Sequence, residues 1–231
     1  DLHLSLRRQR QMCIRDREPT LDGLVARIHL AGDDSPRELV LPVPGEHMAL
    51  NALAALIAVR DYGGDVSEAL EALTHFGGVN RRFQYHGHVG GIRVYDDYAH
   101  HPTEARAVLT AAREVADADA QGLGHPGRVI VCFQPHLFSR TEQFAEEFAK
   151  ALDLADYAIV LDIYGAREKP IPGVTSELIT TQLTIPHKYQ PDFSKVPYDV
   201  AAIAEPGDIV LTMGAGNVTM EADAVIALLK G

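Results

Sequence analysis

Cysteine is scarce in this 231-residue chain, which contains only Cys13 and Cys132. Two thiols provide neither a disulfide framework nor the four ligands of a structural zinc site. A reducing compartment, the cytoplasm, is therefore the expected location. The sequence also lacks any apolar run near the roughly 20 residues that a membrane-spanning helix needs. No membrane partner is expected.

Positive charge is also in short supply. The chain has 21 Lys and Arg against 32 Asp and Glu, which gives a formal net charge of −11. Coating of nucleic acid depends on cations that neutralise phosphates, so no nucleic-acid partner is expected. The N-terminal 17 residues are the exception, because they hold five arginines and only two aspartates. We expect residues 1–17 to be a disordered leader or a non-native extension.

Two segments with different patterns follow this leader. Residues 18–79 contain two strand-like stretches and then two helical ones, expected at 24–30, 38–41, 46–59 and 66–74. Gly77 and Gly78 form the most linker-like point of the interior, so a domain boundary is expected near residue 79. The second predicted domain is then residues 80–231.

The second domain alternates between apolar strands and helices. Strands are expected at 91–95, 128–134, 157–163 and 208–213. Helices are expected at 102–116, 140–154, 176–183, 198–204 and in a final stretch ending near 229. Ser139 to Glu142 has a capping-box pattern, which predicts the start of one of these helices. Apolar strands that alternate with helices predict an α/β fold with a parallel sheet covered on both faces.

The densest chemistry lies at residues 96–104, with the sequence Asp-Asp-Tyr-Ala-His-His-Pro-Thr-Glu. Ligands of open α/β sheets bind at the carboxyl ends of the strands, where this turn is expected. Three roles are open. The turn could hold a divalent metal through Asp96, Asp97, His100 and His101. It could bind a ligand, with Asp97 accepting hydrogen bonds from ribose hydroxyls and the histidines recognising an anion. It could also consist of ordinary turn and cap residues, but so many titratable groups together argue against that.

Weaker signals lie on either side of this turn. Arg81 and Arg82 suit a phosphate clamp, although a solvated pair is the simpler interpretation. His136 and Arg140 follow the strand expected at 128–134 and are placed to meet a substrate carboxylate. The Gly-Ala-Gly-Asn stretch at 214–217 is better explained as a tight turn than as a phosphate loop.

His47 and Asn51 lie four residues apart, on one face of the helix expected at 46–59. An asparagine amide can pair with the edge of an adenine base. A helix cap or an interface contact is the more common role for a lone asparagine in such a helix.

Taken together, residues 44–55, 81–83, 96–104, 133–136 with 139–141, and 212–216 resemble the Mur ligase family, and within it the members that add L-alanine. The resemblance runs in collinear order from about residue 18 to residue 231. It implies that residues 18–79 are the end of the central ATP-binding domain. Residues 80–231 would form the Rossmann-like C-terminal domain.

The resemblance also implies a reaction. ATP would phosphorylate the carboxylate of UDP-N-acetylmuramate, and the amine of L-alanine would displace phosphate from the acyl phosphate during peptidoglycan synthesis. Mg²⁺ would accompany ATP. Carried over by position, the ATP-binding residues would be His47, Asn51, Arg82, Asp97 and Tyr98. The L-alanine-binding residues would be His100, His101, His136 and Arg140, and the catalytic ones Arg82, Asp97, His100 and His101.

Two departures from the family pattern limit this expectation. Leu137 stands where some relatives have arginine, which leaves more of the carboxylate recognition to Arg140. None of the five lysines follows a glycine, so the family's Gly-Lys-Thr/Ser phosphate loop is not in this sequence. Most Mg²⁺ ligands and the sugar-binding domain are expected on a preceding part, and the chain alone is expected to be inactive. A metal-dependent phosphoesterase and a non-catalytic nucleotide or amino-acid binding module are the alternatives.

Overall fold

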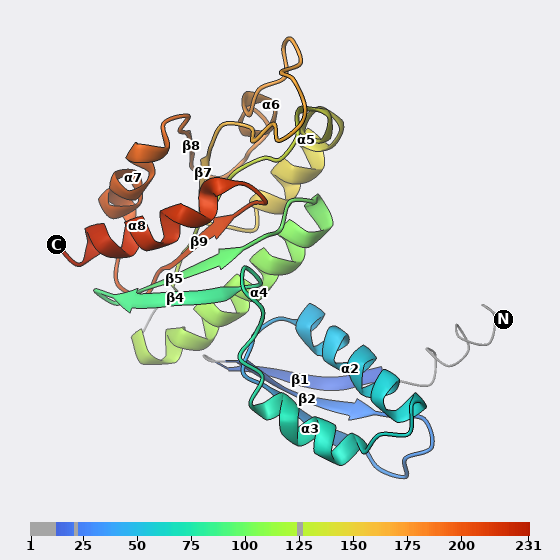
Figure 1. Cartoon of the computed structure of the whole chain (residues 1–231). Helices are drawn as coiled ribbons and strands as arrows, with labels where there is room; N and C mark the ends of the chain where they lie inside the picture. Colours follow the sequence, from blue (N-terminus) through green and yellow to red (C-terminus); the bar gives the residue numbers. More distant parts are fainter. Residues whose placement is uncertain (1–12, 21–22, 124–126) are drawn as a thin grey trace. The chain divides into compact units, whose positions relative to one another are not determined.

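The computed structural model describes residues 13–20, 23–123 and 127–231. The chain forms two compact units, which are divided between Gly78 and Val79 (Figure 1). No helix within the described residues is long and apolar enough to cross a membrane.

Within its described residues, the N-terminal unit is a three-stranded antiparallel sheet packed with two helices. The strands are β1 (Cys13–Thr20), β2 (Gly23–His29) and β3 (Arg37–Leu41), in that spatial order, and the helices are α2 (Glu46–Asp61) and α3 (Val66–Thr74). Alternate residues of β2 are buried with one face of α2, because side chains of a strand alternate between its two sides. Leu24, Ala26 and Ile28 belong to this core.

One alternative of the leader prediction is contradicted in this unit. Cys13–Arg17 are not disordered, because they form the first part of β1 and pair with β2, whereas a non-native origin of residues 1–17 stays a prediction. The remainder of the predicted leader, residues 1–12, lies outside the described residues. β1 is an edge strand, which is held largely by backbone hydrogen bonds. Its charged sequence has no alternating apolar pattern, so the strand was not predicted.

The C-terminal unit is built on a six-stranded sheet with the order β4-β5-β9-β6-β7-β8. Its strands are β4 (Gln84–Val89), β5 (Ile92–Asp97), β6 (Val129–Phe133), β7 (Tyr157–Val160), β8 (His187–Tyr189) and β9 (Ile209–Met213). Five strands are parallel, whereas β4 runs antiparallel to β5. The expectation of a wholly parallel sheet therefore needs this correction, since a two-glycine hairpin at Gly90 and Gly91 returns the chain beside itself.

Helices cover both faces of this sheet (Figure 1). α4 (Pro102–Leu123), α5 (Phe138–Leu152) and α6 (Glu177–Thr180) share one core with alternate strand residues such as Val131 and Phe133. α7 (Val196–Ile203) and α8 (Met220–Leu229) pack on the other face with Ile130 and Cys132. The short 3-10 turns η1 (Phe193–Lys195) and η2 (Asn217–Thr219) precede α7 and α8. The predicted α/β fold with two helical layers is confirmed.

Candidate functional site

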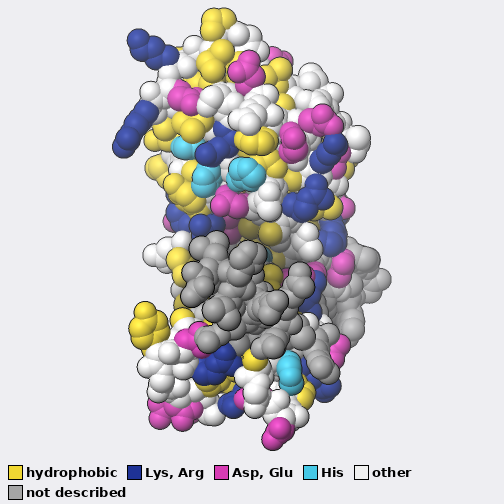
Figure 2. All heavy atoms as spheres, turned by 90° about the vertical axis from the view of Figure 1, so that its right-hand side faces the viewer, with side chains coloured by type: hydrophobic (Ala, Val, Ile, Leu, Met, Phe, Trp, Pro, Cys, Tyr) yellow, Lys and Arg dark blue, Asp and Glu magenta, His cyan; other side chains and the backbone are white. Residues whose placement is uncertain are grey.

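The carboxyl ends of β5, β9, β6 and β7 meet at one edge of the large sheet. The pairs Asp97 with Met213, Phe133 with Met213 and Phe133 with Val160 fix this alignment. On the side of the C-terminal unit toward which the β5 arrow points in Figure 1, histidine side chains gather among Lys and Arg side chains (Figure 2). The residues that follow these strands are therefore the candidate site.

Asp97 ends β5 as a buried clamp for the backbone. Its Oδ2 accepts a hydrogen bond from the Phe83 N–H and its Oδ1 accepts one from the Ala99 N–H, both at 2.7 Å. Its side chain is 1% exposed. Burial raises the pKa of Asp97 to about 6, although the two N–H donors and Arg82 favour the charged form. The carboxylate predicted to bind a ribose thus already accepts hydrogen bonds from two backbone N–H groups, those of Phe83 and Ala99.

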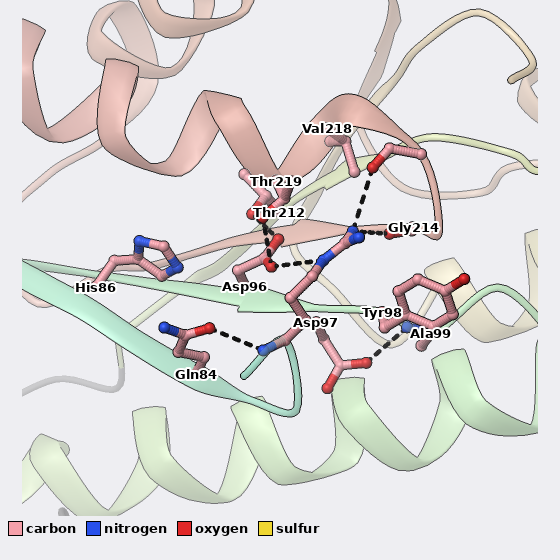
Figure 3. Close-up of polar contacts among 12 residues, drawn as sticks. Gln84, His86, Asp96, Asp97, Tyr98, Ala99, Thr212, Gly214, Val218 and Thr219 are labelled. Carbon is pink, nitrogen blue, oxygen red and sulfur yellow. Dashed lines mark hydrogen bonds and ion pairs between the residues drawn. The ribbon is translucent and has the colours of Figure 1, made fainter. Parts of the chain in front are cut away.

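Asp96 is buried on the opposite side of the sheet (Figure 3). Its Oδ1 accepts a hydrogen bond from the Thr212 hydroxyl, and its Oδ2 accepts from the Thr219 hydroxyl and from Nε of Arg81. The carboxylate oxygens of both aspartates therefore already accept hydrogen bonds from protein donors. Within the described ranges, no cluster of three or more His, Cys, Asp or Glu side chains is arranged to hold a metal ion. The engaged carboxylates count against the metal-dependent phosphoesterase.

The two arginines before β4 point to different surroundings. Arg81 is partly buried and pairs with Asp96 at 3.2 Å, whereas Arg82 is exposed. The guanidinium carbons of Arg81 and Arg82 lie 4.8 and 5.9 Å from the centre of the Tyr98 ring. Arg82 is therefore the arginine available to an anion, and Tyr98 lies beside it as a flat, 37% exposed surface.

His100, after β5, and His136, after β6, come together although β9 lies between these two strands. Their rings lie 5.6 Å apart, and His136 stacks on Tyr164 at 5.8 Å. Nη1 of Arg140 donates to the carbonyl of His100 at 3.3 Å. Burial, followed by the nearby charges of His100 and Arg140, lowers the pKa of His136. Nδ1 of His136 is buried and makes no hydrogen bond to the protein.

His101 is not part of this ring cluster. Its ring packs 5.2 Å from Phe144 of α5, and its Nδ1 accepts from the Thr103 N–H at the start of α4. Glu104 accepts hydrogen bonds from the N–H groups of both His100 and His101. One carboxylate in the first turn of α4 therefore fixes the backbone of both histidines.

The start of α5 differs from the prediction. The helix begins at Phe138, its N-cap is Leu137 at φ 70°, and no side chain of the helix caps it. Glu168, from the loop after β7, accepts instead from the N–H and the hydroxyl of Ser139. The predicted capping box is wrong because a distant carboxylate already occupies the exposed N–H groups of the first turn.

The glycines after β9 serve packing, as the tight-turn interpretation predicts. A Cβ on Gly214 would lie 2.6 Å from the carbonyl oxygen of Gln134, and one on Gly216 would strike Oε1 of the same residue. That Oε1 accepts from the Val218 N–H, and Nε2 donates to Asn217. Gln134 is 2% exposed and was missed as a structural residue of the site. Its place directly after a buried strand was the available signal.

His47 and Asn51 lie on α2 of the N-terminal unit, where Asn51 is exposed and His47 half-buried. The predicted one-turn spacing on a helix is present. Their contact with adenine stays a prediction, as do the ligand roles of the residues in the C-terminal unit.

Residues 81–216 match the model of the Mur ligase glutamate ligase domain. The chain belongs to the Mur ligase family. It is 55% identical over 215 residues to a UDP-N-acetylmuramate–L-alanine ligase of Rhodococcus opacus, covering 90% of this chain and 43% of the relative. It is 52% identical over 208 residues to the ligase of the same name from Mycolicibacterium smegmatis, covering 90% of this chain and 42% of the relative.

Solved structures of the Mur ligase family agree with these matches. A UDP-N-acetylmuramate–alanine ligase from Thermotoga maritima superposes with a TM-score of 0.76 at 29% identity, over 94% of this chain and 45% of that one. A MurF ligase from Thermotoga maritima, in complex with ADP, shares the fold at a TM-score of 0.69 and 22% identity, over 95% and 46% of the two chains. The chain spans less than half the length of the relatives it matches.

Proposed function

We propose that this chain supplies the C-terminal part of a ligase that uses ATP to join L-alanine to UDP-N-acetylmuramate in peptidoglycan synthesis. The observation that carries the proposal is the 55% identity to an enzyme of that name over 90% of this chain. The N-terminal unit, predicted as residues 18–79, is assigned to the end of the central ATP-binding domain, and residues 80–231 to the C-terminal domain. A cytoplasmic location accompanies this function.

The clustered side chains suit the chemistry of the reaction. The carboxylate of UDP-N-acetylmuramate takes the γ-phosphoryl group of ATP and ADP leaves. The amine of L-alanine then attacks the acyl phosphate and expels inorganic phosphate. Arg82 is an exposed cation that can pair with phosphoryl oxygens. His100, His136 and Arg140 lie within one cluster that can surround a small amino acid. His136, whose lowered pKa favours the neutral imidazole, is suited to take the proton that the ammonium of alanine must lose.

Mg²⁺ accompanies ATP in this proposal and would neutralise phosphate charge. The buried carboxylates of this unit do not fit as its ligands, because Asp96 and Asp97 already accept hydrogen bonds from protein groups.

The test is a chimera in which residues 23–231 replace the matching C-terminal segment of the Rhodococcus opacus ligase. We expect phosphate release that depends on both L-alanine and UDP-N-acetylmuramate. Arg140→Ala should raise the KM for alanine about ten- to a hundredfold and change kcat little, because it removes a charged partner of the carboxylate.

Arg106→Ala is the matched control, since Arg106 is an exposed arginine on α4. It should leave both constants unchanged. A folded chimera without alanine-dependent phosphate release would refute the proposed function, and an unchanged KM in Arg140→Ala would remove Arg140 from alanine binding.

A further inference from the structure

We infer that Arg81 is a positioning residue, which sets the place of the neighbouring Arg82 by anchoring the turn that carries both. The inference rests on the proposed function only in giving Arg82 a contact with the phosphate of ATP. The geometry of residues 79–83 and of the strand ends beneath them supports the positioning itself.

The turn holds Arg82 between two residues of unusual backbone. Arg81 has φ 59° and Phe83 has φ 46°, in the left-handed region that side-chain-bearing residues rarely adopt. The Arg82 N–H donates to the carbonyl of Val79 at 3.0 Å. Such a conformation persists where the surroundings hold it in place, so each left-handed residue needs an anchor.

Arg81 is anchored to Asp96 and Gly214, and Figure 3 shows Asp96 beside Thr219 on the α8 side of the sheet. Its Nε donates to Asp96 at 3.2 Å, and its Nη2 donates to the carbonyls of Gly214 at 2.5 Å and Gly216 at 3.3 Å. Asp96 is fully buried and is held in turn by Thr212 and Thr219. One guanidinium thereby ties the turn to the ends of both β5 and β9. A buried carboxylate that loses its cation is costly, so this contact is strongly retained.

Phe83 has its anchor on the other side of the sheet. Its N–H donates to Asp97, and its ring stacks on Tyr95 with centroids 4.5 Å apart in the core shared with α4. The Tyr98 N–H donates to the carbonyl of Arg81 at 2.8 Å, which closes the loop from β5 back to the turn. Arg82 is thus exposed at the sheet edge while its two neighbours are fixed on opposite faces.

A double-mutant cycle in the chimera tests the inference. Arg82→Met should lower kcat/KM for ATP about a hundredfold, as expected for a lost phosphate contact. Arg81→Met should lower it at least about tenfold. Arg81→Met/Arg82→Met should be no worse than Arg82→Met alone, because Arg81 acts through Arg82. Multiplying effects in the double variant would overturn the inference, as would full activity in either single variant.

Two further variants separate positioning from stability. Arg81→Lys keeps a charge beside Asp96 but lacks the planar fork that reaches two carbonyls, so its kcat/KM should lie between those of the wild type and Arg81→Met. Thr219→Val removes a different donor from the same carboxylate. It should lower the melting temperature without raising the KM for ATP, and a raised KM would show that any damage to Asp96 suffices.

Amide hydrogen exchange of the 231-residue chain itself gives a readout that needs no activity. Arg81→Met or Arg81→Lys should speed exchange at residues 82 and 83 at least tenfold and leave the amides of β6 protected. Thr219→Val should not speed exchange at residues 82 and 83. If the chimera is inactive but this exchange pattern appears, the proposed function fails and the positioning stands. Unchanged exchange at residues 82 and 83 would overturn the positioning in either case.

Discussion

At the candidate site, two adjacent aspartates and two adjacent arginines each have different surroundings. Asp96 meets Arg81 and the threonines on the α8 side, whereas Asp97 holds two backbone N–H groups on the α4 side. Arg81 is drawn inward while Arg82 stays exposed. Successive side chains of a strand point to opposite faces, which separates the two aspartates of β5. The two arginines lie in a turn instead, where Arg81 has φ 59°.

At the residue scale, Asp97 gives a prediction about pH. Its pKa is raised from a usual value of 3.8 to about 6 in the native state. Between these values the native state binds the proton better than the unfolded chain does. The stability from this group is therefore fully present below about pH 4 and is lost as the pH rises through 6, with an upper bound of about 3 kcal/mol.

The measurement is the free energy of unfolding by urea at pH 4 and pH 7, for the wild type and for Asp97→Asn. Other carboxylates, such as Glu168 and Asp199, have lowered pKa values and act in the opposite direction. The informative quantity is therefore the difference between the two proteins. The free energy of unfolding of the wild type, relative to that of Asp97→Asn, should be larger at pH 4 than at pH 7. A difference that does not depend on pH would contradict the raised pKa.

At the element scale, loops that follow different strands fix one another. Glu168, after β7, occupies the first turn of α5, and Gln134, after β6, fills the space beside the glycines after β9. His136 forms an isolated parallel bridge with Tyr164, which extends the sheet contacts past the ends of the strands. The candidate site is therefore a set of mutually supporting loops on a rigid sheet.

Gly216→Ala tests this packing. The added Cβ would strike Oε1 of Gln134 and lie 2.8 Å from the Tyr164 ring, so we expect a loss of about 1–3 kcal/mol in unfolding free energy. Gly77→Ala is the control, because a Cβ there meets nothing within 4 Å and its φ is not in the left-handed region. Equal effects of the two substitutions in urea denaturation would contradict tight packing at Gly216.

At the scale of the whole molecule, the α/β fold and its principal helices followed from the sequence. Apolar runs such as 208–213 carry a pattern that only a doubly covered sheet satisfies. β1, β4 and β8 were missed because edge strands are held by backbone bonds and carry polar side chains such as His88 and Lys188. Residues 96–104 predicted the position of the candidate site, whose ligand roles stay predictions, but the hydroxyl donors to Asp96 lie more than 100 positions away. No local pattern encodes such partners.

The C-terminal unit should fold alone. Residues 79–231 contain the complete six-stranded sheet and both helical layers, each with its own buried core. Expressed separately, this segment should melt in one cooperative transition that coincides with a transition of the whole chain. Calorimetry and near-ultraviolet circular dichroism would measure it, and a segment without near-ultraviolet signal would show that it depends on the N-terminal unit.

The opposite placement of Asp96 and Asp97 has a consequence for how this region tolerates insertions and deletions. One residue gained or lost inside β5 would reverse which carboxylate points to each helical layer, and Arg81 and Phe83 would both face the wrong partner. The hairpin at Gly90 and Gly91 has no such restriction, since length changes there leave the parity of 92–97 intact. Length variation among homologous sequences should therefore concentrate in the hairpin and spare the strand.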